Sequence, residues 1–376
     1  MSPPLQEYAL FLASGLVGAA TNLLGLPRSG RPLRRILVVK VDHLGDAITA
    51  TPALRALRDA LPDATIDLVL HPAVAPLFQR TPLADRIITY ESPLFRRESP
   101  ISPAADIQAI AHEHYDAIVE LRGDWATLGL PFRTGAIRRV DRGTIRVSDW
   151  IRRRLGPNRH SPLHEVDTNL EIVRALLPGA VARTSAALPP EIHVTREADR
   201  SMRSILTARG LDPAVDFITL HPGAAWRPRA WRAERYAALA DRLAASYGVP
   251  FAVVGLPSER DVEERMRDAL KNARVAWLFG VLSLPEIAAL LRASRLFIGN
   301  DSGLAHLAAA CGTPVVSLFG PQDPRRFAPR SAQALTLHHR VSCCPCTQTV
   351  CVRPELPCVN LIEIVEVEAA ARAALG

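Results

Sequence analysis

The sequence predicts an α/β protein made of two successive halves, each a doubly wound parallel sheet covered by helices. Short apolar runs alternate with segments whose apolar residues recur at helical spacing, which is typical of parallel β-α-β units. A polar, proline-bearing stretch at residues 178–190 separates two such alternations. Neither a GxGxxG pattern nor a P-loop pattern occurs, which argues against a dinucleotide-dependent dehydrogenase and a P-loop enzyme.

The first half begins with residues 35–40 (RILVVK), a continuous apolar run of the kind that a strand buried on both faces requires. Gly45 lies in the turn that follows, and a helix is predicted from Asp46 onward because apolar residues then recur at helical spacing. Further strands are predicted at residues 64–70, 86–90 and 115–121, with a short helix at 72–79.

Arginines crowd together between residues 133 and 159. Such a run is either a solvated surface or a contact for an anionic acceptor. The acceptor candidates are Arg138, Arg139 and Arg142.

The second half repeats the alternation after the boundary at 178–190. Strands are predicted at residues 217–221, 251–255, 275–279, 296–298 and 313–319, and helices at 196–209, 233–247, 259–271 and 284–293.

Residues 296–321 (LFIGNDSGLAHLAAACGTPVVSLFGP) predict a strand, a tight turn and a helix that ends at Gly312. A helix that opens at such a turn offers free backbone N–H groups and a partial positive charge, which suits a phosphate. Asp301, Ser302, Gly303 and His306 lie at this point. The alternative is an ordinary strand–helix connection capped by Asp301.

Composition limits the class of protein. The 376 residues suffice for two domains, and 48% hydrophobic with 22% charged residues is the balance of a soluble globular protein. The net charge of +7, in which Arg far outnumbers Lys, favours phosphates, carboxylates or an anionic membrane surface as partners. Aromatic residues make up only 5% and no base-stacking pattern appears, so no nucleic-acid partner is predicted.

Residues 9–26 form an uncharged apolar segment followed by Arg28, Arg31, Arg34 and Arg35. No basic residue precedes it, unlike in a secretory signal. We interpret the segment as a helix on the cytoplasmic face of a membrane, with the arginines near anionic headgroups. A single membrane span and a helix packed on the protein itself remain open.

Four segments together resemble a known family. VDHLGDAITATPALRAL resembles the N-terminal signature of the inverting glycosyltransferase family 9, the ADP-heptose:lipopolysaccharide heptosyltransferases. LHPGAAWRPRAW, VVGLPSERD and IGNDSGLAHLAAACGTPVVSLFGP resemble its three donor-site segments. The resemblance runs from about Arg35 to the C-terminus and leaves the N-terminal apolar segment outside.

The resemblance implies the GT-B fold, with two Rossmann-like domains that face each other across a cleft. It assigns residues 1–33 to an N-terminal segment, 34–185 to an acceptor-side domain, and 186–376 to a donor domain. Inverting transfer needs a base for the acceptor hydroxyl, and Asp46 takes that role by resemblance, with Asp42 as the fallback. A helix N-cap is the alternative reading of Asp46.

The donor residues also follow from the resemblance. The leaving nucleoside diphosphate is expected to be stabilised by protein groups without a catalytic metal. Arg229 is the expected phosphate clamp, in a basic-x-Trp pattern where Lys is common, and Arg227 shares its role. Gly223, Ala224 and Ala225 are expected to line the pyrophosphate, and Glu259 to lie near the ribose hydroxyls.

A cysteine cluster lies near the C-terminus, in CCPCTQTVCVRPELPC. Cys343, Cys346, Cys351 and Cys358 have metal-ligand spacing, which predicts a structural Zn²⁺ or iron in a reducing compartment. Reduced free thiols or a disulfide are the alternative. Such a metal would hold a loop in place and would not catalyse.

Taken together, these expectations describe a cytoplasmic enzyme, peripheral to the inner membrane, that moves heptose from ADP-heptose to an anionic lipid-linked or core-oligosaccharide acceptor. One alternative is a GT-B transferase or epimerase that uses another nucleotide sugar. A second alternative is a non-catalytic module whose metal-thiolate site binds a partner.

Overall fold

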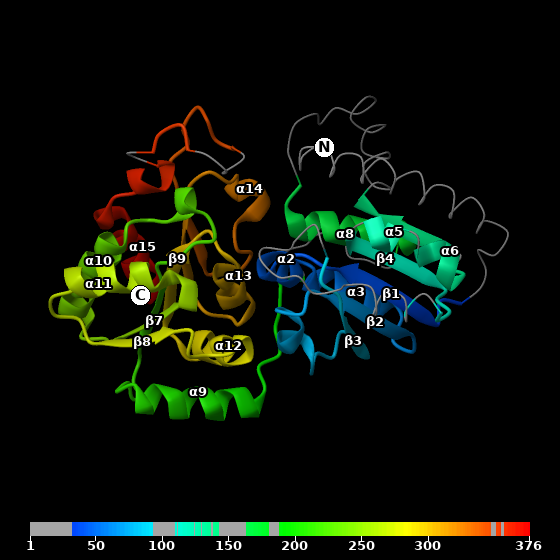
Figure 1. The fold of residues 1–376 in the computed structure, drawn as a ribbon, viewed down its shortest axis with the longest axis horizontal. Helices are drawn as coiled ribbons and strands as arrows, with labels where there is room; N and C mark the ends of the chain where they lie inside the picture. Colours follow the sequence, from blue (N-terminus) through cyan, green and yellow to red (C-terminus); the bar gives the residue numbers. More distant parts are fainter. Residues whose placement is uncertain are drawn as a thin grey trace. The chain divides into compact units, whose positions relative to one another are not determined.

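The computed structural model describes residues 32–92, 110, 112–123, 125–128, 130–136, 138–142, 163–179, 188–346, 351–354 and 357–376. The chain divides into two compact units, Met1–Pro190 and Glu191–Gly376, each with its own parallel sheet (Figure 1). The predicted surface helix at residues 9–26 lies outside the described residues. Within the described ranges, no helix has both the length and the apolar character needed to cross a membrane.

Unit 1 contains a sheet of five strands in the order β3-β2-β1-β4-β5. All neighbouring strands pair in parallel. The strands are β1 (Arg35–Lys40), β2 (Thr65–Leu70), β3 (Arg86–Thr89), β4 (Ala117–Arg122) and β5 (Arg138–Asp141). The helices are α2 (Leu44–Thr49), α3 (Thr51–Ala60), η2 (Ala75–Phe78), α5 (Trp125–Leu128), α6 (Leu130–Thr134) and α8 (Glu165–Leu176).

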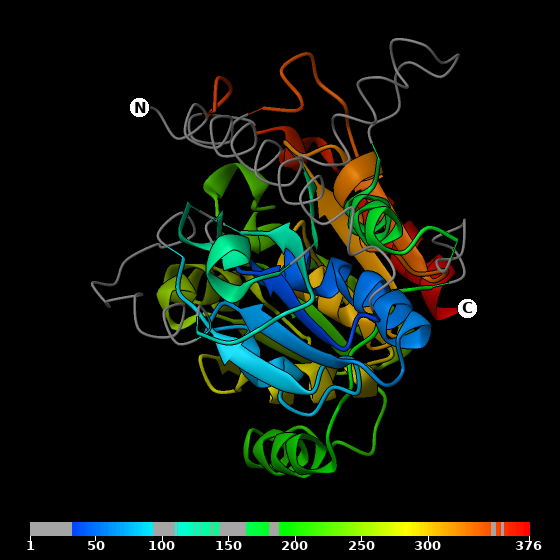
Figure 2. The ribbon, with the colours of Figure 1, turned by 90° about the vertical axis from the view of Figure 1, so that its right-hand side faces the viewer.

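The order of strands in unit 1 reverses between β1 and β4. From β1 the chain builds β2 and β3 on one side, and then returns to place β4 and β5 on the other. Helices α3 and α8 pack against each other, and α8 also lies against β4 and β5 (Figures 1 and 2). In open parallel sheets, ligands bind beyond the carboxyl ends of the strands at such a reversal. The segments that follow β1 and β4 therefore mark the functional edge of this unit.

Unit 2 contains six parallel strands in the order β11-β10-β9-β6-β7-β8. They are β6 (Ile218–His221), β7 (Phe251–Gly255), β8 (Val275–Phe279), β9 (Leu296–Asn300), β10 (Val315–Phe319) and β11 (Ala334–His338). The longer helices are α9 (Arg196–Ala208), α10 (Ala233–Tyr247), α11 (Arg260–Ala269), α12 (Leu284–Ala293), α13 (Gly303–Ala310) and α15 (Ile364–Leu375). Short helical turns are η4 (Arg227–Arg229), η5 (Pro257–Glu259), α14 (Pro324–Phe327) and η6 (Cys358–Leu361).

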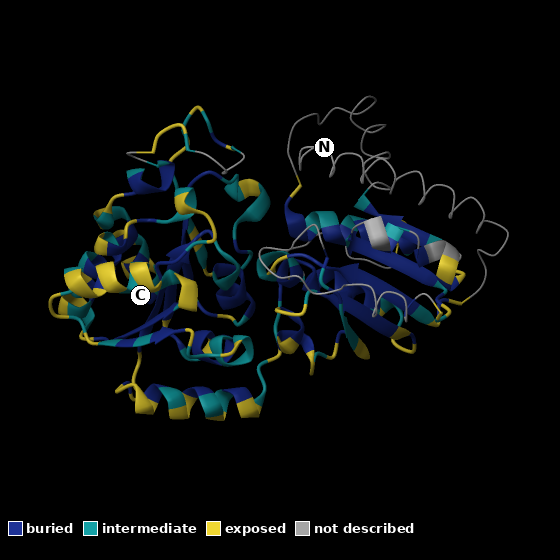
Figure 3. Ribbon diagram, in the orientation of Figure 1, coloured by how far each residue is buried: buried dark blue, intermediate teal, exposed yellow. Residues whose placement is uncertain are grey.

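Two apolar cores cover the two faces of the unit 2 sheet. One core joins the strands to α10, α11 and α15, and includes Trp231, Tyr236 and Met266. The other joins them to α9 and α12 through Met202 and Leu290. The central strands β6, β7, β9 and β10 are buried, whereas exposed residues gather on the outward sides of α9 and α11 (Figure 3). Both units are thus doubly wound α/β structures, which confirms the predicted fold class.

Several predicted boundaries are wrong, for identifiable reasons. The helix predicted from Asp46 is two helices, α2 and α3, that meet at Ala50 ahead of Pro52. The strand predicted to end at residue 298 continues through Gly299 to Asn300. Gly299 lies within the strand because it pairs with Ser317 on β10 and His221 on β6. A side chain at this position would come within 2.6 Å of the ring of Phe297.

Candidate donor site and catalytic carboxylate

In unit 2 the strand order reverses between β6 and β9, and the buried Asn300 at the end of β9 organises this point. Its Nδ2 donates to the carbonyls of Pro222 and Gly223, at 2.9 and 3.0 Å. Its Oδ1 accepts from the Trp231 backbone N–H at 3.0 Å and from the Tyr236 hydroxyl at 3.1 Å. One amide therefore fixes both ends of the loop between β6 and α10, which carries the predicted Gly223, Arg227 and Arg229.

Gly223 is where the loop passes closest to Glu259. A Cβ at Gly223 would lie 2.2–2.4 Å from the Glu259 carboxylate, so any other residue there would displace that carboxylate. The carboxylate accepts from the Leu256 backbone N–H at 2.7 Å and is largely buried. Burial acts to raise the pKa of Glu259. The contacts with His221 and with the Leu256 N–H outweigh the effect of burial, so the pKa lies below its ordinary value. The structure thus brings together two predicted donor residues, Gly223 and Glu259.

Arg229 lies on η4, and its guanidinium Nη1 is 3.4 Å from the Asp301 carboxylate Oδ2. The guanidinium also stacks on the ring of Trp226, with Cζ 4.6 Å from the ring centroid. A planar guanidinium suits both contacts. Arg229 is thereby held beside the loop that precedes α13, where an anion would meet it. The predicted partner Arg227 lies on the same turn but is exposed, as is Ala225, while Ala224 is half-buried.

Ser302 occupies the N-cap position of α13, and Gly303 begins the helix. The Ser302 hydroxyl makes no capping hydrogen bond and instead lies 3.2 Å from Nδ1 of His221. His306 follows in the first full turn and is buried. The cap is Ser302, not Asp301. The backbone N–H groups at the start of α13 therefore receive no side-chain cap from Ser302, and groups of this kind attract anions.

A segment near the C-terminus, residues 360–362, makes hydrogen bonds to loop residues 222–232. The Trp231 indole Nε1 donates to the Ile362 carbonyl at 2.9 Å, and the Asn360 Oδ1 accepts from the Arg232 N–H at 3.0 Å. Gly320 lets the loop approach: a Cβ there would lie 3.2 Å from the Pro228 carbonyl oxygen. Loop residues 222–232 are thus fixed by strand β9, by Gly320 and by η6.

In unit 1 the predicted base Asp46 lies in the first turn of α2, directly after β1. Its side chain is 33% exposed, and its nearest ionic partner is the His43 Nδ1 at 4.0 Å. The N-cap of α2 is His43, so Asp46 is not the cap. An accessible carboxylate at the carboxyl end of a strand, at the reversal of strand order, is suitably placed for a base.

Asp42, the fallback base, is in a different environment. It is 5% exposed, and its Oδ2 lies 3.3 Å from the buried Lys40 ammonium and 3.9 Å from the Arg122 Nε. Burial and the Asp46 charge raise the pKa of Asp42 to about 6, against the opposing effect of Lys40, Arg122 and Arg142. An enclosed carboxylate of this kind supports the edge of β1 and β4, and it is a poorer candidate base than Asp46.

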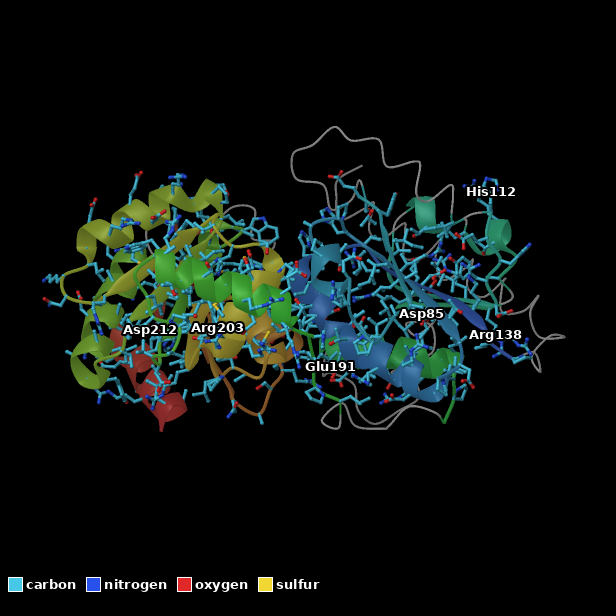
Figure 4. The ribbon with its side chains drawn as sticks, turned by 90° about the horizontal axis from the view of Figure 1, so that it is seen from below. Asp85, His112, Arg138, Glu191, Arg203 and Asp212 are labelled. Atoms are coloured by element: carbon cyan, nitrogen blue, oxygen red, sulfur yellow. The ribbon has the colours of Figure 1, made fainter. Side chains whose placement is uncertain are left out.

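The three predicted acceptor arginines differ in environment. Arg138 begins the edge strand β5 and is half-buried (Figure 4). Arg139 is 0% exposed, and its guanidinium pairs with Glu120 at 2.8 Å and Asp141 at 3.3 Å. Arg142 pairs with Glu165 at 2.5 Å and donates to the Leu121 carbonyl. Arg139 is therefore a buried structural group and is withdrawn as an acceptor contact. The arginines at 146–159 lie outside the described residues.

The cysteines do not gather as predicted. Among the described residues, no group of three or more His, Cys, Asp or Glu side chains is arranged to hold a metal ion. Cys358 instead contacts Cys344, which was not in the predicted set, and both are buried against Gly320. Burial and the neighbouring Cys344 raise the pKa of Cys358 to about 12. The thiols as placed do not fit a tetrahedral site, so the metal stays a prediction.

Sequence reasoning missed three residues of the donor site: Asn300, His221 and Trp226. Asn300 follows a buried apolar run, where an amide needs partners within the fold, and this position could have revealed it. His221 ends a predicted strand just before Gly223, and this position could have revealed it. Trp226 gave no periodic signal, because it lies in an irregular loop.

Two doubly wound α/β units, with a cationic loop at the reversal point of the second, are typical of the GT-B class. The chain belongs to glycosyltransferase family 9: the family model described as "Glycosyltransferase family 9 (heptosyltransferase)" matches residues 105–356. The resemblance seen in the sequence is therefore confirmed, and the protein is a glycosyltransferase of the heptosyltransferase family.

Individual relatives support membership of this family. Lipopolysaccharide heptosyltransferase 3 of Escherichia coli is 26% identical over 292 residues, covering 74% of this chain and 81% of the relative. The crystal structure of the family 9 glycosyl transferase of Veillonella parvula has a TM-score of 0.75 at 23% identity, covering 91% of this chain and 97% of that chain. The structure of E. coli heptosyltransferase WaaC with ADP has a TM-score of 0.64 at 19% identity, covering 90% of this chain and 99% of that chain. The two solved structures support the fold, and family membership leaves the non-catalytic alternative without support.

Proposed function

We propose that this glycosyltransferase transfers a heptose from ADP-heptose to a lipopolysaccharide core or a related anionic acceptor, with inversion at the anomeric carbon. The relatives' names support this acceptor, since the E. coli relative is a lipopolysaccharide heptosyltransferase. The structural neighbour WaaC, which is described with ADP, supports an adenine nucleotide as donor.

The observation that carries the proposal is the arrangement of Arg229 beside Asp301 and the start of α13. A diphosphate that binds there receives a charge-assisted contact from Arg229 and backbone N–H groups from α13. Negative charge grows on the β-phosphate as the glycosidic bond breaks, and donors fixed in advance stabilise that charge without reorganisation. These groups support catalysis that needs no metal at the diphosphate.

In the proposed reaction, Asp46 accepts the proton of the acceptor hydroxyl as its oxygen attacks the anomeric carbon. The bond from that carbon to the β-phosphate oxygen breaks, and ADP leaves with the electron pair. The accessible carboxylate of Asp46 is free of a close cationic partner among the described residues beyond His43 at 4.0 Å. Such a carboxylate can be approached by an acceptor hydroxyl, as a general base must be.

The acceptor side of the proposal rests on charge. A chain with net charge +7 favours acceptors that carry phosphates or acidic sugars. Arg138, on the edge strand of unit 1, is the acceptor candidate that we retain, and Arg142 contributes only if it leaves Glu165. We also propose a cytoplasmic location peripheral to the inner membrane, for which the uncharged segment 9–26 and the arginines after it are the support.

A nucleotide panel tests the donor. The full chain is incubated with ADP-heptose, UDP-sugars and GDP-sugars, together with deacylated core-oligosaccharide acceptors, and the released nucleoside diphosphate is identified. We expect release of ADP alone, and only ADP should raise the melting temperature. Release of UDP would instead favour the alternative transferase or epimerase that uses another nucleotide sugar, and would overturn the ADP-heptose proposal.

The cysteine segment enters the proposal only as a structural element. A Zn²⁺ or iron ion bound by Cys343, Cys346, Cys351 and Cys358 would fasten the segment before α15, and no catalytic step passes through it. Metal analysis of the purified chain tests this proposal. A stoichiometric metal that Cys346→Ser and Cys351→Ser each remove would support it, and absence of metal from anaerobically purified protein would overturn it.

A further inference from the structure

His221 is a buried titratable residue at the end of β6 that the proposed mechanism does not use. Its side chain is 7% exposed. Nδ1 lies 3.2 Å from the Ser302 hydroxyl, and Nε2 lies 3.8 Å from the Glu259 carboxylate. The strand register pairs His221 with Gly299, where a Cβ would come within 3.3 Å of the His221 Cβ. The imidazole is thus enclosed, and each ring nitrogen faces a different predicted donor-binding residue.

The contact with His221 has a consequence for Ser302. A serine at an N-cap normally accepts a hydrogen bond from a backbone N–H two or three residues later. Ser302 makes no such bond, and its hydroxyl is directed to His221. His221 therefore keeps Ser302 from covering the first N–H groups of α13, which the proposed function assigns to the diphosphate.

Acidic, basic and titratable side chains lie on the elements around His221. Glu259 on η5 and Asp301 after β9 are acidic, Arg229 on η4 is basic, and His306 on α13 is titratable. Asp301 and Arg229 pair at 3.4 Å and so offset each other. Glu259 faces the imidazole at 3.8 Å, and a diphosphate would add further negative charge beside Ser302. An added negative charge within a few ångströms favours the imidazolium form.

We propose that His221 binds the donor and takes up a proton as the diphosphate binds, so that it links the ribose carboxylate Glu259 to the diphosphate site at Ser302. The inference rests on the proposed function, because it requires a nucleoside diphosphate at this place. A proton moves from solvent to the imidazole, and no covalent bond of the donor changes. Donor affinity then depends on pH through a residue that is not the catalytic base.

Calorimetry of ADP binding to the full chain tests the inference. Titrations in HEPES and in Tris buffer at the same pH give the number of protons taken up, since the two buffers differ in ionisation enthalpy. ADP itself titrates near neutral pH, so the informative quantity is the difference between the wild type and a variant. His221→Gln and His221→Asn cannot ionise, and Asn retains a polar group near Ser302. His193→Gln, an exposed histidine of the same unit, is the matched control.

On binding ADP, the wild type should take up more protons than either His221 variant, by at most about one. The His193→Gln variant should match the wild type. ADP binding by the His221 variants should be about tenfold weaker at pH 6.5, and the deficit should shrink to about twofold at pH 8.5. Equal proton uptake in the wild type and both variants would overturn the inference while leaving the proposed function intact. Absence of ADP binding to the wild type would overturn the proposed function, and the inference with it.

Discussion

The guanidinium of Arg229 lies 3.4 Å from the carboxylate of Asp301, which is only 5% exposed. The two residues come from different loops, one after β6 and one after β9, on either side of the point where the strand order reverses. The pair holds the cation in place before an anion binds. A diphosphate would find Arg229 already oriented, at a lower entropic cost than that of ordering a free side chain.

Arg229→Ala should weaken ADP binding roughly 10- to 100-fold, because a charge-assisted contact is worth about 1.5–3 kcal/mol. The loss also leaves the Asp301 carboxylate facing the diphosphate. Arg229→Lys should recover part of the affinity, because it restores the charge without the planar fork that stacks on Trp226. Calorimetry measures both. Arg295→Ala, at the opposite end of β9, is the control and should leave ADP affinity unchanged. Normal ADP affinity of the Arg229→Ala variant would exclude Arg229 as the phosphate clamp.

Asp46→Asn should lower heptose transfer by about 10²–10⁴-fold, because general-base catalysis contributes about that much. ADP affinity should stay within about twofold, since the described donor contacts all lie in unit 2. Single-turnover transfer and calorimetry separate the two effects. Asp59→Asn, an exposed carboxylate on α3, is the matched control. Near-normal turnover by Asp46→Asn would exclude Asp46 as the base.

Asn300→Leu should destabilise unit 2 by about 2–4 kcal/mol, because it leaves four hydrogen-bonding groups without their partner in a buried place. Asn300→Asp should also destabilise, since its carboxylate faces the carbonyls of Pro222 and Gly223. Urea unfolding gives the free energies. The exposed Asn272→Ala should change stability by less than about 0.5 kcal/mol. Equal stability of the wild type and Asn300→Leu would contradict this role.

Glu120 predicts a pH dependence of stability. Burial, with a contribution from Asp141, raises the pKa of Glu120 to about 7, although Arg139 and Thr127 act in the opposite direction. A folded-state pKa above the unfolded value contributes stability that is full below about pH 4.5 and is lost as the pH rises through about 7. The difference from the ordinary value of 4.5 corresponds to roughly 3 kcal/mol.

Glu120→Gln should lack this contribution. The free energy of unfolding of the wild type minus that of the variant should therefore fall by roughly 3 kcal/mol between pH 4.5 and 8. Asp42, whose pKa is raised to about 6, adds a contribution of the same sign to both proteins and cancels in the difference. Urea unfolding at pH 5, 6, 7 and 8 measures it. Parallel pH curves for the wild type and Glu120→Gln would contradict the burial argument.

The sequence predicted the sheets well because their strands are continuous apolar runs. The predicted bounds of 35–40, 251–255 and 275–279 match β1, β7 and β8. Strand β5 was not predicted, because arginines in its sequence suggested a surface. Arg139 is buried there only because Glu120 and Asp141 neutralise it, and such pairing is not visible in a local pattern.

The predicted donor residues were recognisable by resemblance, whereas the groups that hold them in place were not. Asn300 binds residues 64 to 78 positions away, so no local spacing could reveal its partners. The predicted metal ligands did not include Cys344, which meets Cys358 because both lie against Gly320. The contact between the two thiols therefore depends on how closely each cysteine approaches the backbone at Gly320.

The hydrogen bond from Trp231 to the carbonyl of Ile362 spans 131 positions of the chain. A ribosome adds residues one at a time, so the loop that carries Arg229 must wait for η6 before it acquires its support. Strands β6 to β10 can pair earlier, whereas the support that Ile362 gives to the loop comes only after residue 362 has been added. Nascent chains arrested before residue 358 should therefore contain an ordered sheet that does not yet retain ADP.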